Sequence, residues 1–109
     1  MTGTAAFLTE AAGLAERLLA RGRSIFDVRY DGLAFGSWVL TAGTPKRRVR
    51  VTWDGREATL RVEAAEFGDP QSRPAWRAVS DHPVADRSPD ALLRLTEAAI
   101  LAHSGAPAA

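Results

Sequence analysis

Apolar and polar residues alternate on both sides of an Asp54-Gly55 pair near the middle of the chain. Asp-Gly between two alternating runs is a typical signal of a two-residue hairpin turn, because both residues tolerate positive φ angles. With this turn, Val51 lies opposite Ala58, and all apolar members of the two runs share one face of the hairpin. These members are Val49, Val51, Trp53, Ala58, Leu60 and Val62. The pattern predicts a β-hairpin with one buried and one basic face.

Two more strands are predicted before this hairpin. Residues 25–30 and 33–41 flank a second turn signal, Asp31-Gly32, which sets Val28 opposite Phe35. Residues 42–45 then turn the chain so that Val39 lies opposite Val49. The result is a four-stranded antiparallel meander over residues 25–64. Its predicted inner face carries Phe26, Val28, Tyr30, Leu33, Phe35, Val39, Val49, Val51, Trp53, Leu60 and Val62.

An amphipathic helix is predicted at each end of the meander. Residues 5–21 place their leucines in one arc, with Glu10 among the polar residues outside it, and Gly22 ends the helix. The second helix spans 89–103 after Ser88, a residue type favoured at the N-cap, and 104–109 is a tail. We expect an α+β, two-layer sandwich of order α-β-β-β-β-α with both helices on one face, and one domain over residues 1–109.

Residues 67–87 show no sustained period and contain several prolines. They are predicted to be an irregular loop, with a short fifth strand at 76–79 as an alternative.

Composition narrows the chemistry. The chain has 109 residues and no cysteine, which excludes thiol catalysis, disulfides and cysteine zinc sites. We expect a soluble cytoplasmic protein with no membrane span, no cofactor and no metal site, since no signal peptide, glycine-rich phosphate loop or metal-ligand spacing is present. The net charge is only +1, but residues 46–64 hold six basic and three acidic residues.

The basic residues point to the outer face of the predicted sheet as the functional surface. In the predicted register this face exposes Trp38, Leu40, Arg48, Arg50 and Arg61, and Trp76 follows in the 67–87 loop. Tryptophan and arginine are enriched in protein interfaces, so we expect a non-catalytic interaction module that binds a protein partner or its own copy. The same residues suit nucleic-acid binding, which is the first alternative.

A second alternative is a small enzyme or ligand-binding protein with a pocket at Trp76–His82. Ser80, Asp81 and His82 are residue types used in nucleophilic catalysis, but consecutive side chains do not converge as a triad does. No catalytic residue is therefore assigned.

The element order is similar in outline to the double-stranded-RNA-binding domain, which runs α-β-β-β-α. That family binds phosphates with lysines at the start of its last helix, where this chain has Ser88, Pro89 and Asp90. Small bacterial immunity proteins and secretion chaperones also resemble this arrangement of a curved meander with helices on one side. No motif matches any of these families, so the resemblance is one of fold outline and no family is assigned.

Overall fold

The computed structural model describes residues 2–31, 36–67 and 73–103, with side chains from 9 to 102 in those ranges. Along the described chain, one helix precedes five strands and a second helix follows them. The elements are α1 (Thr2–Ala20), β1 (Ser24–Asp31), β2 (Ser37–Gly43), β3 (Arg47–Asp54), β4 (Thr59–Glu66), β5 (Arg77–Pro83) and α2 (Pro89–His103).

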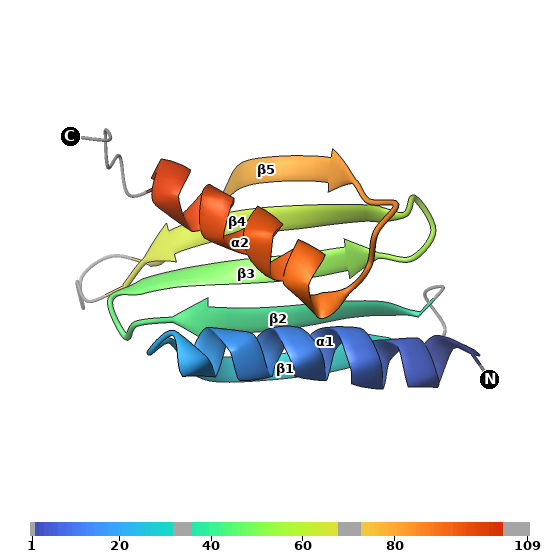
Figure 1. Cartoon of the computed structure of the whole chain (residues 1–109). Helices are drawn as coiled ribbons and strands as arrows, with labels where there is room; N and C mark the ends of the chain where they lie inside the picture. The colour runs from blue at the N-terminus through green and yellow to red at the C-terminus, as the bar shows by residue number, and fades with distance from the viewer. Residues whose placement is uncertain (1, 32–35, 68–72, 104–109) are drawn as a thin grey trace.

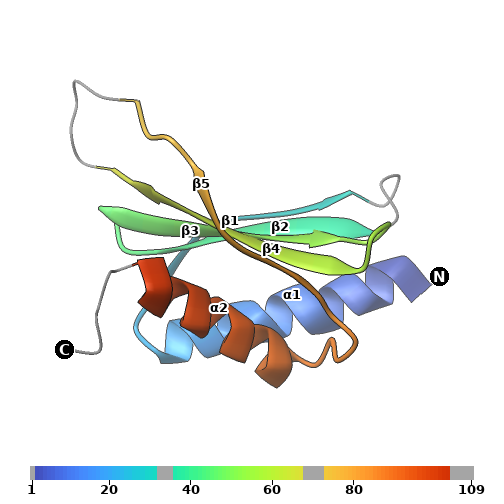
Figure 2. The same ribbon diagram turned by 90° about the horizontal axis from the view of Figure 1, so that it is seen from above.

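The strands form one antiparallel sheet of order β1-β2-β3-β4-β5, and both helices lie on the same face of it (Figures 1 and 2). Helix α1 packs on β1 and β2, α2 packs on β4 and β5, and the helices contact each other. This confirms the α+β sandwich. The prediction of four strands is wrong, because β5 occupies seven residues of the segment expected to be an irregular loop.

The β3–β4 hairpin keeps the predicted inner face in a different register, except that Ala58, predicted on this face, lies exposed in the turn. Its connection spans four residues, since Asp54 pairs with Thr59, so the predicted two-residue turn is wrong. The Asp54 carboxylate accepts hydrogen bonds from the backbone N–H groups of Arg56 and Glu57, and Ala58 takes the positive φ of 53°. The register moves by four positions, an even number, so each strand keeps its predicted faces.

Strand β2 is turned over relative to its prediction. Trp38 pairs with Trp53, and Leu40 pairs with Val51, so these β2 side chains lie on the inner face. The shift from the predicted register is three positions, and an odd shift exchanges the two faces of a strand. Val39, predicted to be inside, is only half-buried on the outer face.

Strand β1 is longer than predicted and carries a bulge. Asp31 still pairs with Ser37, which rules out a two-residue turn at Asp31-Gly32; Leu33 and Phe35, assigned to the inner face, lie outside the described residues. Val28 lies on the inner face, as predicted, but it pairs with Leu40 and not with Phe35. The register shifts between Ile25 and Asp27, and this bulge places Phe26 on the outer face instead.

The core lies between the sheet and the helices. Its fully buried large side chains come from every layer: Leu14 and Leu18 of α1, Leu92 of α2, and Trp38, Leu40, Val51, Trp53, Leu60 and Val62 of the sheet. Helix α1 ends at Gly22 as predicted, where the amides of Gly22 and Arg23 bond back to the carbonyls of Leu19 and Leu18. The Ser88 hydroxyl accepts a hydrogen bond from the Ala91 amide and caps α2.

Glu10 is buried, although the sequence pattern places it outside the apolar arc of the first helix. Its carboxylate accepts a hydrogen bond of 2.6 Å from Arg87, and the Trp38 indole N–H lies 3.4 Å from the same oxygen. The Arg87 guanidinium also stacks on Trp53, 4.1 Å from the ring centroid. A buried charge is tolerated here because it is paired and hydrogen-bonded.

Candidate protein-interaction surface

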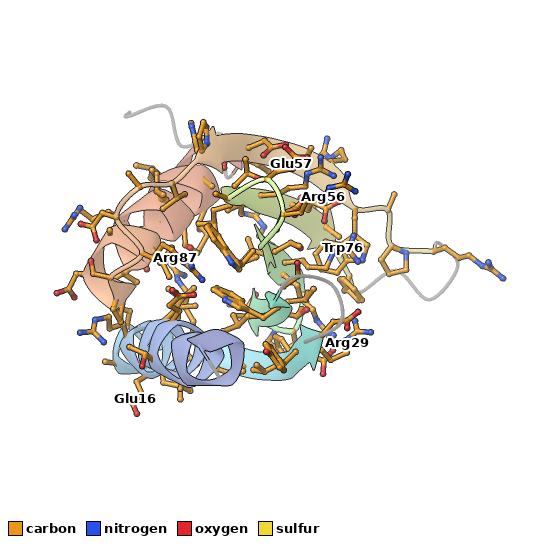
Figure 3. All side chains as sticks on the ribbon, turned by 90° about the vertical axis from the view of Figure 1, so that its right-hand side faces the viewer. Glu16, Arg29, Arg56, Glu57, Trp76 and Arg87 are labelled. Atoms are coloured by element: carbon orange, nitrogen blue, oxygen red, sulfur yellow. The ribbon has the colours of Figure 1, made fainter. Side chains whose placement is uncertain are left out.

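The candidate surface is the outer face of the sheet, opposite the helices. In the side-chain view, Trp76 and Arg29 lie on this outer face, whereas Arg87 points between the helices and the sheet (Figure 3). Because α1 and α2 share the inner face, no described helix covers the outer one.

One end of the outer face holds a stack of arginines and aromatic rings, here called the arginine–aromatic cluster. The Arg48 guanidinium carbon lies 4.1 Å from the centroid of the Phe26 ring and 4.2 Å from that of Phe67. Phe67 meets Trp76 edge to face at 5.9 Å, and the Arg50 guanidinium lies 4.4 Å from the Trp76 ring. Cation–π stacking of this kind contributes roughly 0.5–1 kcal/mol per contact at exposed sites.

Arg50 also forms an ion pair with Glu63 on the neighbouring strand, at 3.0 Å. Both side chains are largely buried, at 29% and 17% exposed, so this pair is better shielded from solvent than a typical surface pair. Arg50 is therefore held between a carboxylate and an indole ring, which fixes its position on the face.

Beside this cluster the outer face forms an open concavity of about 750 Å³. Its charged lining is balanced, with three arginines and three carboxylates. The lining residues are Arg29, Tyr30, Asp31, Ser37, Trp38, Val39, Arg50, Thr52, Asp54, Thr59, Arg61 and Glu63. At the rim, Arg61 pairs with Asp81 at 3.2 Å, and the Ser37 hydroxyl accepts a hydrogen bond from the Gly55 amide.

The six residues proposed from the sequence divide into two groups. Four of them lie on the outer face: Arg48, Arg50, Arg61 and Trp76. Arg48, Arg50 and Trp76 belong to the arginine–aromatic cluster, and Arg61 pairs with Asp81. The side chains of Trp38 and Leu40 lie on the opposite face, 1% and 0% exposed, although Trp38 is also among the residues that line the concavity. Their placement outside was wrong because the predicted strand 33–41 has apolar residues in both alternating sets, whereas β2 begins at Ser37 and has them mainly in the set of Trp38, Leu40 and Ala42.

Sequence reasoning missed Phe26 and Phe67 as members of this surface. Phe26 was assigned to the core by alternation, and the bulge that moves it has no sequence signal. Phe67 was assigned to the start of the irregular 67–87 loop, outside the predicted meander of residues 25–64.

The residues of the alternative pocket, Trp76, Ser80, Asp81 and His82, do not line the concavity of the outer face. Ser80 lies on the inner face opposite Val62, while Asp81 pairs with Arg61 on the outer face, so alternation along β5 separates them. Among the described residues no group of three metal-ligating side chains is close enough to hold a metal ion.

No helix within the described ranges is both long and apolar enough to cross a membrane. Comparison with known proteins finds no matching family, no similar curated protein and no similar solved structure.

Proposed function

We propose that this chain is a non-catalytic interaction module that binds a protein partner through the outer face of its sheet. The observation that carries the proposal is the composition of that face. It combines an open concavity with ordered tryptophan and arginine side chains, the residue types that dominate binding energy in protein interfaces.

The charge balance of the concavity favours a protein partner over nucleic acid. A phosphate backbone is bound by an excess of arginine and lysine, and each neutralised phosphate makes the affinity more sensitive to salt. Here three carboxylates, Asp31, Asp54 and Glu63, accompany the three arginines of the lining. A protein surface of mixed charge is the complementary partner for such a lining.

A photo-crosslinking amino acid placed on each face tests this proposal. At Thr52, which is half-buried and lines the concavity, we expect a crosslinked protein adduct when the chain is incubated in lysate of its own host. At Ala98, an exposed position of α2, the same amino acid serves as the matched control and forms no adduct of that mass. Adducts of equal yield at both positions, or none at Thr52, contradict the proposal.

The variant Trp76→Ala then measures the contribution of the arginine–aromatic cluster. We expect the yield of the Thr52 adduct to fall, with the melting temperature lowered by only a few degrees, because Trp76 lies outside the helix–sheet core and loses only its surface contacts with Arg50 and Phe67. A nucleic-acid adduct whose yield falls steeply with salt would establish the alternative function instead.

A further inference from the structure

Strand β1 is an edge strand that carries two exposed apolar side chains among charged ones. Among the described strands it has one neighbour, β2, so no described strand lies along its other side. Four large apolar side chains are exposed in the described part of the chain, and two of them, Phe26 (37%) and Val28 (39%), belong to β1. A third, Leu19 (55%), belongs to α1, the helix that packs on β1. Exposed apolar side chains along one edge mark an interaction site.

The opposite edge differs. Strand β5 ends at Pro83, which has no backbone N–H to donate, and its exposed residues include Arg77, Asp81 and His82. Proline is a usual feature that prevents an edge strand from pairing with another chain, whereas charge does not distinguish the two edges, since β1 also carries exposed Asp27, Arg29 and Asp31. Strand β1 contains no proline, and its bulge lies towards its N-terminal end.

The charges of β1 are complementary to those of a second copy in antiparallel orientation. Directly opposed residues share a face, so Val28, on the inner face, must meet an inner residue of the other strand. Placing Val28 opposite Val28 of the second copy sets Asp27 opposite Arg29, and the two-fold axis repeats this pair. If the two strands paired about residue 27, Asp27 would face Asp27 of the second copy. If they paired about residue 29, Arg29 would face Arg29, so both shifts place like charges opposite each other.

We propose that two copies of this chain dimerise through β1, paired antiparallel about Val28. The contact joins two five-stranded sheets into one, closes the exposed Val28 side chains against each other, and forms a cluster of four alternating charges. Asp27 and Arg29 already form an ion pair within one chain at 2.8 Å, so both side chains lie on the outer face before association. The two-fold axis runs through the sheet, and both concave outer faces are on the same side of the dimer.

Charge reversal with complementation tests the dimer. The full chain should have the mass of a dimer by light scattering and sedimentation over a range of concentrations. In the proposed pairing, residue 27 of one copy faces residue 29 of the other. Asp27→Arg therefore places arginine opposite Arg29, and Arg29→Asp places aspartate opposite Asp27. Each variant alone should raise the dissociation constant about tenfold or more, because the like-charge contact occurs twice. Mixed in equal amounts, the two variants oppose arginine to aspartate at every contact and should form a heterodimer.

The control is Glu57→Arg, the same charge change at an exposed position in the β3–β4 turn, which should leave the mass unchanged. The Asp27–Arg29 pair is solvent-exposed, so its loss should leave the melting temperature of each monomer nearly unchanged. A monomeric wild-type chain overturns the proposal. A dimer that resists both single variants, or single variants that do not combine, also overturns it. None of these outcomes depends on the crosslinking result, so the dimer and the proposed function fail separately.

Discussion

The β3–β4 hairpin and strand β2 are neighbours in one sheet, and the register of both was predicted wrongly. The hairpin strands nevertheless keep their predicted buried faces, whereas the buried and exposed faces of β2 are exchanged. In β3 and β4, arginines alternate with valine, tryptophan and leucine, so only one orientation keeps the charges in solvent. In the predicted strand 33–41, by contrast, apolar residues occupy both alternating sets, with Leu33, Phe35 and Val39 in one set and Trp38 and Leu40 in the other. The comparison shows that polar residues on the solvent face, more than apolar residues on the buried face, determine a strand's orientation.

The largest expected effect tests the hairpin. Val51→Asp places an unpaired carboxylate in the core, at a fully buried position, and should destabilise the domain by more than about 4 kcal/mol. Thr52→Asp, one residue further along β3, faces Arg61 across the outer face and should change the stability by less than about 0.5 kcal/mol. Circular dichroism during urea unfolding measures both. Equal effects would mean that β3 does not have one buried face.

The second prediction concerns β2, where sequence and structure disagree. Trp38→Ala should cost about 3–5 kcal/mol, because the side chain is fully buried against the helices. Val39→Ala, on the half-buried outer face, should cost less than about 1.5 kcal/mol. Urea titrations of the two variants compare them directly. If Val39→Ala were the more damaging, the register derived from the alternation would be the correct one.

The third prediction concerns the turn that sets the β2 register. Gly43 has a φ of +132°, and a Cβ added there would lie 2.4 Å from the Arg47 carbonyl oxygen. Gly43→Ala should therefore destabilise the protein by about 2–3 kcal/mol. Gly22, at φ +83° with no atom within 4 Å of an added Cβ, is the control, and Gly22→Ala should cost about 1 kcal/mol. Equal melting temperatures for the two variants would show that the β2–β3 turn tolerates a side chain.

The smallest effect concerns the contact between the helices, which joins the β1–β2 half of the molecule to the β4–β5 half. Arg17 of α1 donates a hydrogen bond of 2.6 Å to Asp90 of α2, and this bond and the arginine charge hold the pKa of Asp90 below its ordinary value. A carboxylate with a lowered pKa stabilises the fold above its unfolded pKa, and the stabilisation is lost as pH falls through the folded pKa.

Arg17→Gln should therefore raise the pKa of Asp90, measured by NMR titration of its carboxyl carbon. The part of the stability that the wild-type chain loses as Asp90 becomes protonated in acid should be absent from the variant. The pKa of Asp86, which the Ser88 amide lowers through a hydrogen bond, is the internal control and should not move. An unchanged titration of Asp90 would show that Arg17 does not contact it in solution.

Much of the fold follows from the sequence. The two helices, the cap at Ser88, the stop at Gly22 and the buried face of the central hairpin all arise from local signals, namely periodicity, capping chemistry and charge alternation. The fifth strand followed only in part: a short strand at 76–79 was an alternative, but its extent to Pro83 did not follow, because Arg77–Pro83 has no regular alternation and pairs along the edge that β4 offers.

The candidate surface was predictable only in part. Arg48, Arg50 and Arg61 alternate with core residues, and this local pattern is enough to place them in solvent. Phe26 reaches the same face through a bulge, and Trp76 reaches it through the path of the chain before β5, which no short-range signal specifies.

The sequence by itself determined the α+β fold class, the two helices of the helix layer, and the orientation of β3 and β4. Each of these depends on interactions between residues close in the chain, or on the cost of burying an arginine. The tertiary structure alone decided the orientation of β2. Burial of Trp38 beside Trp53, with its indole N–H directed to Glu10, stabilises one of the two orientations that the apolar pattern of residues 33–41 leaves open.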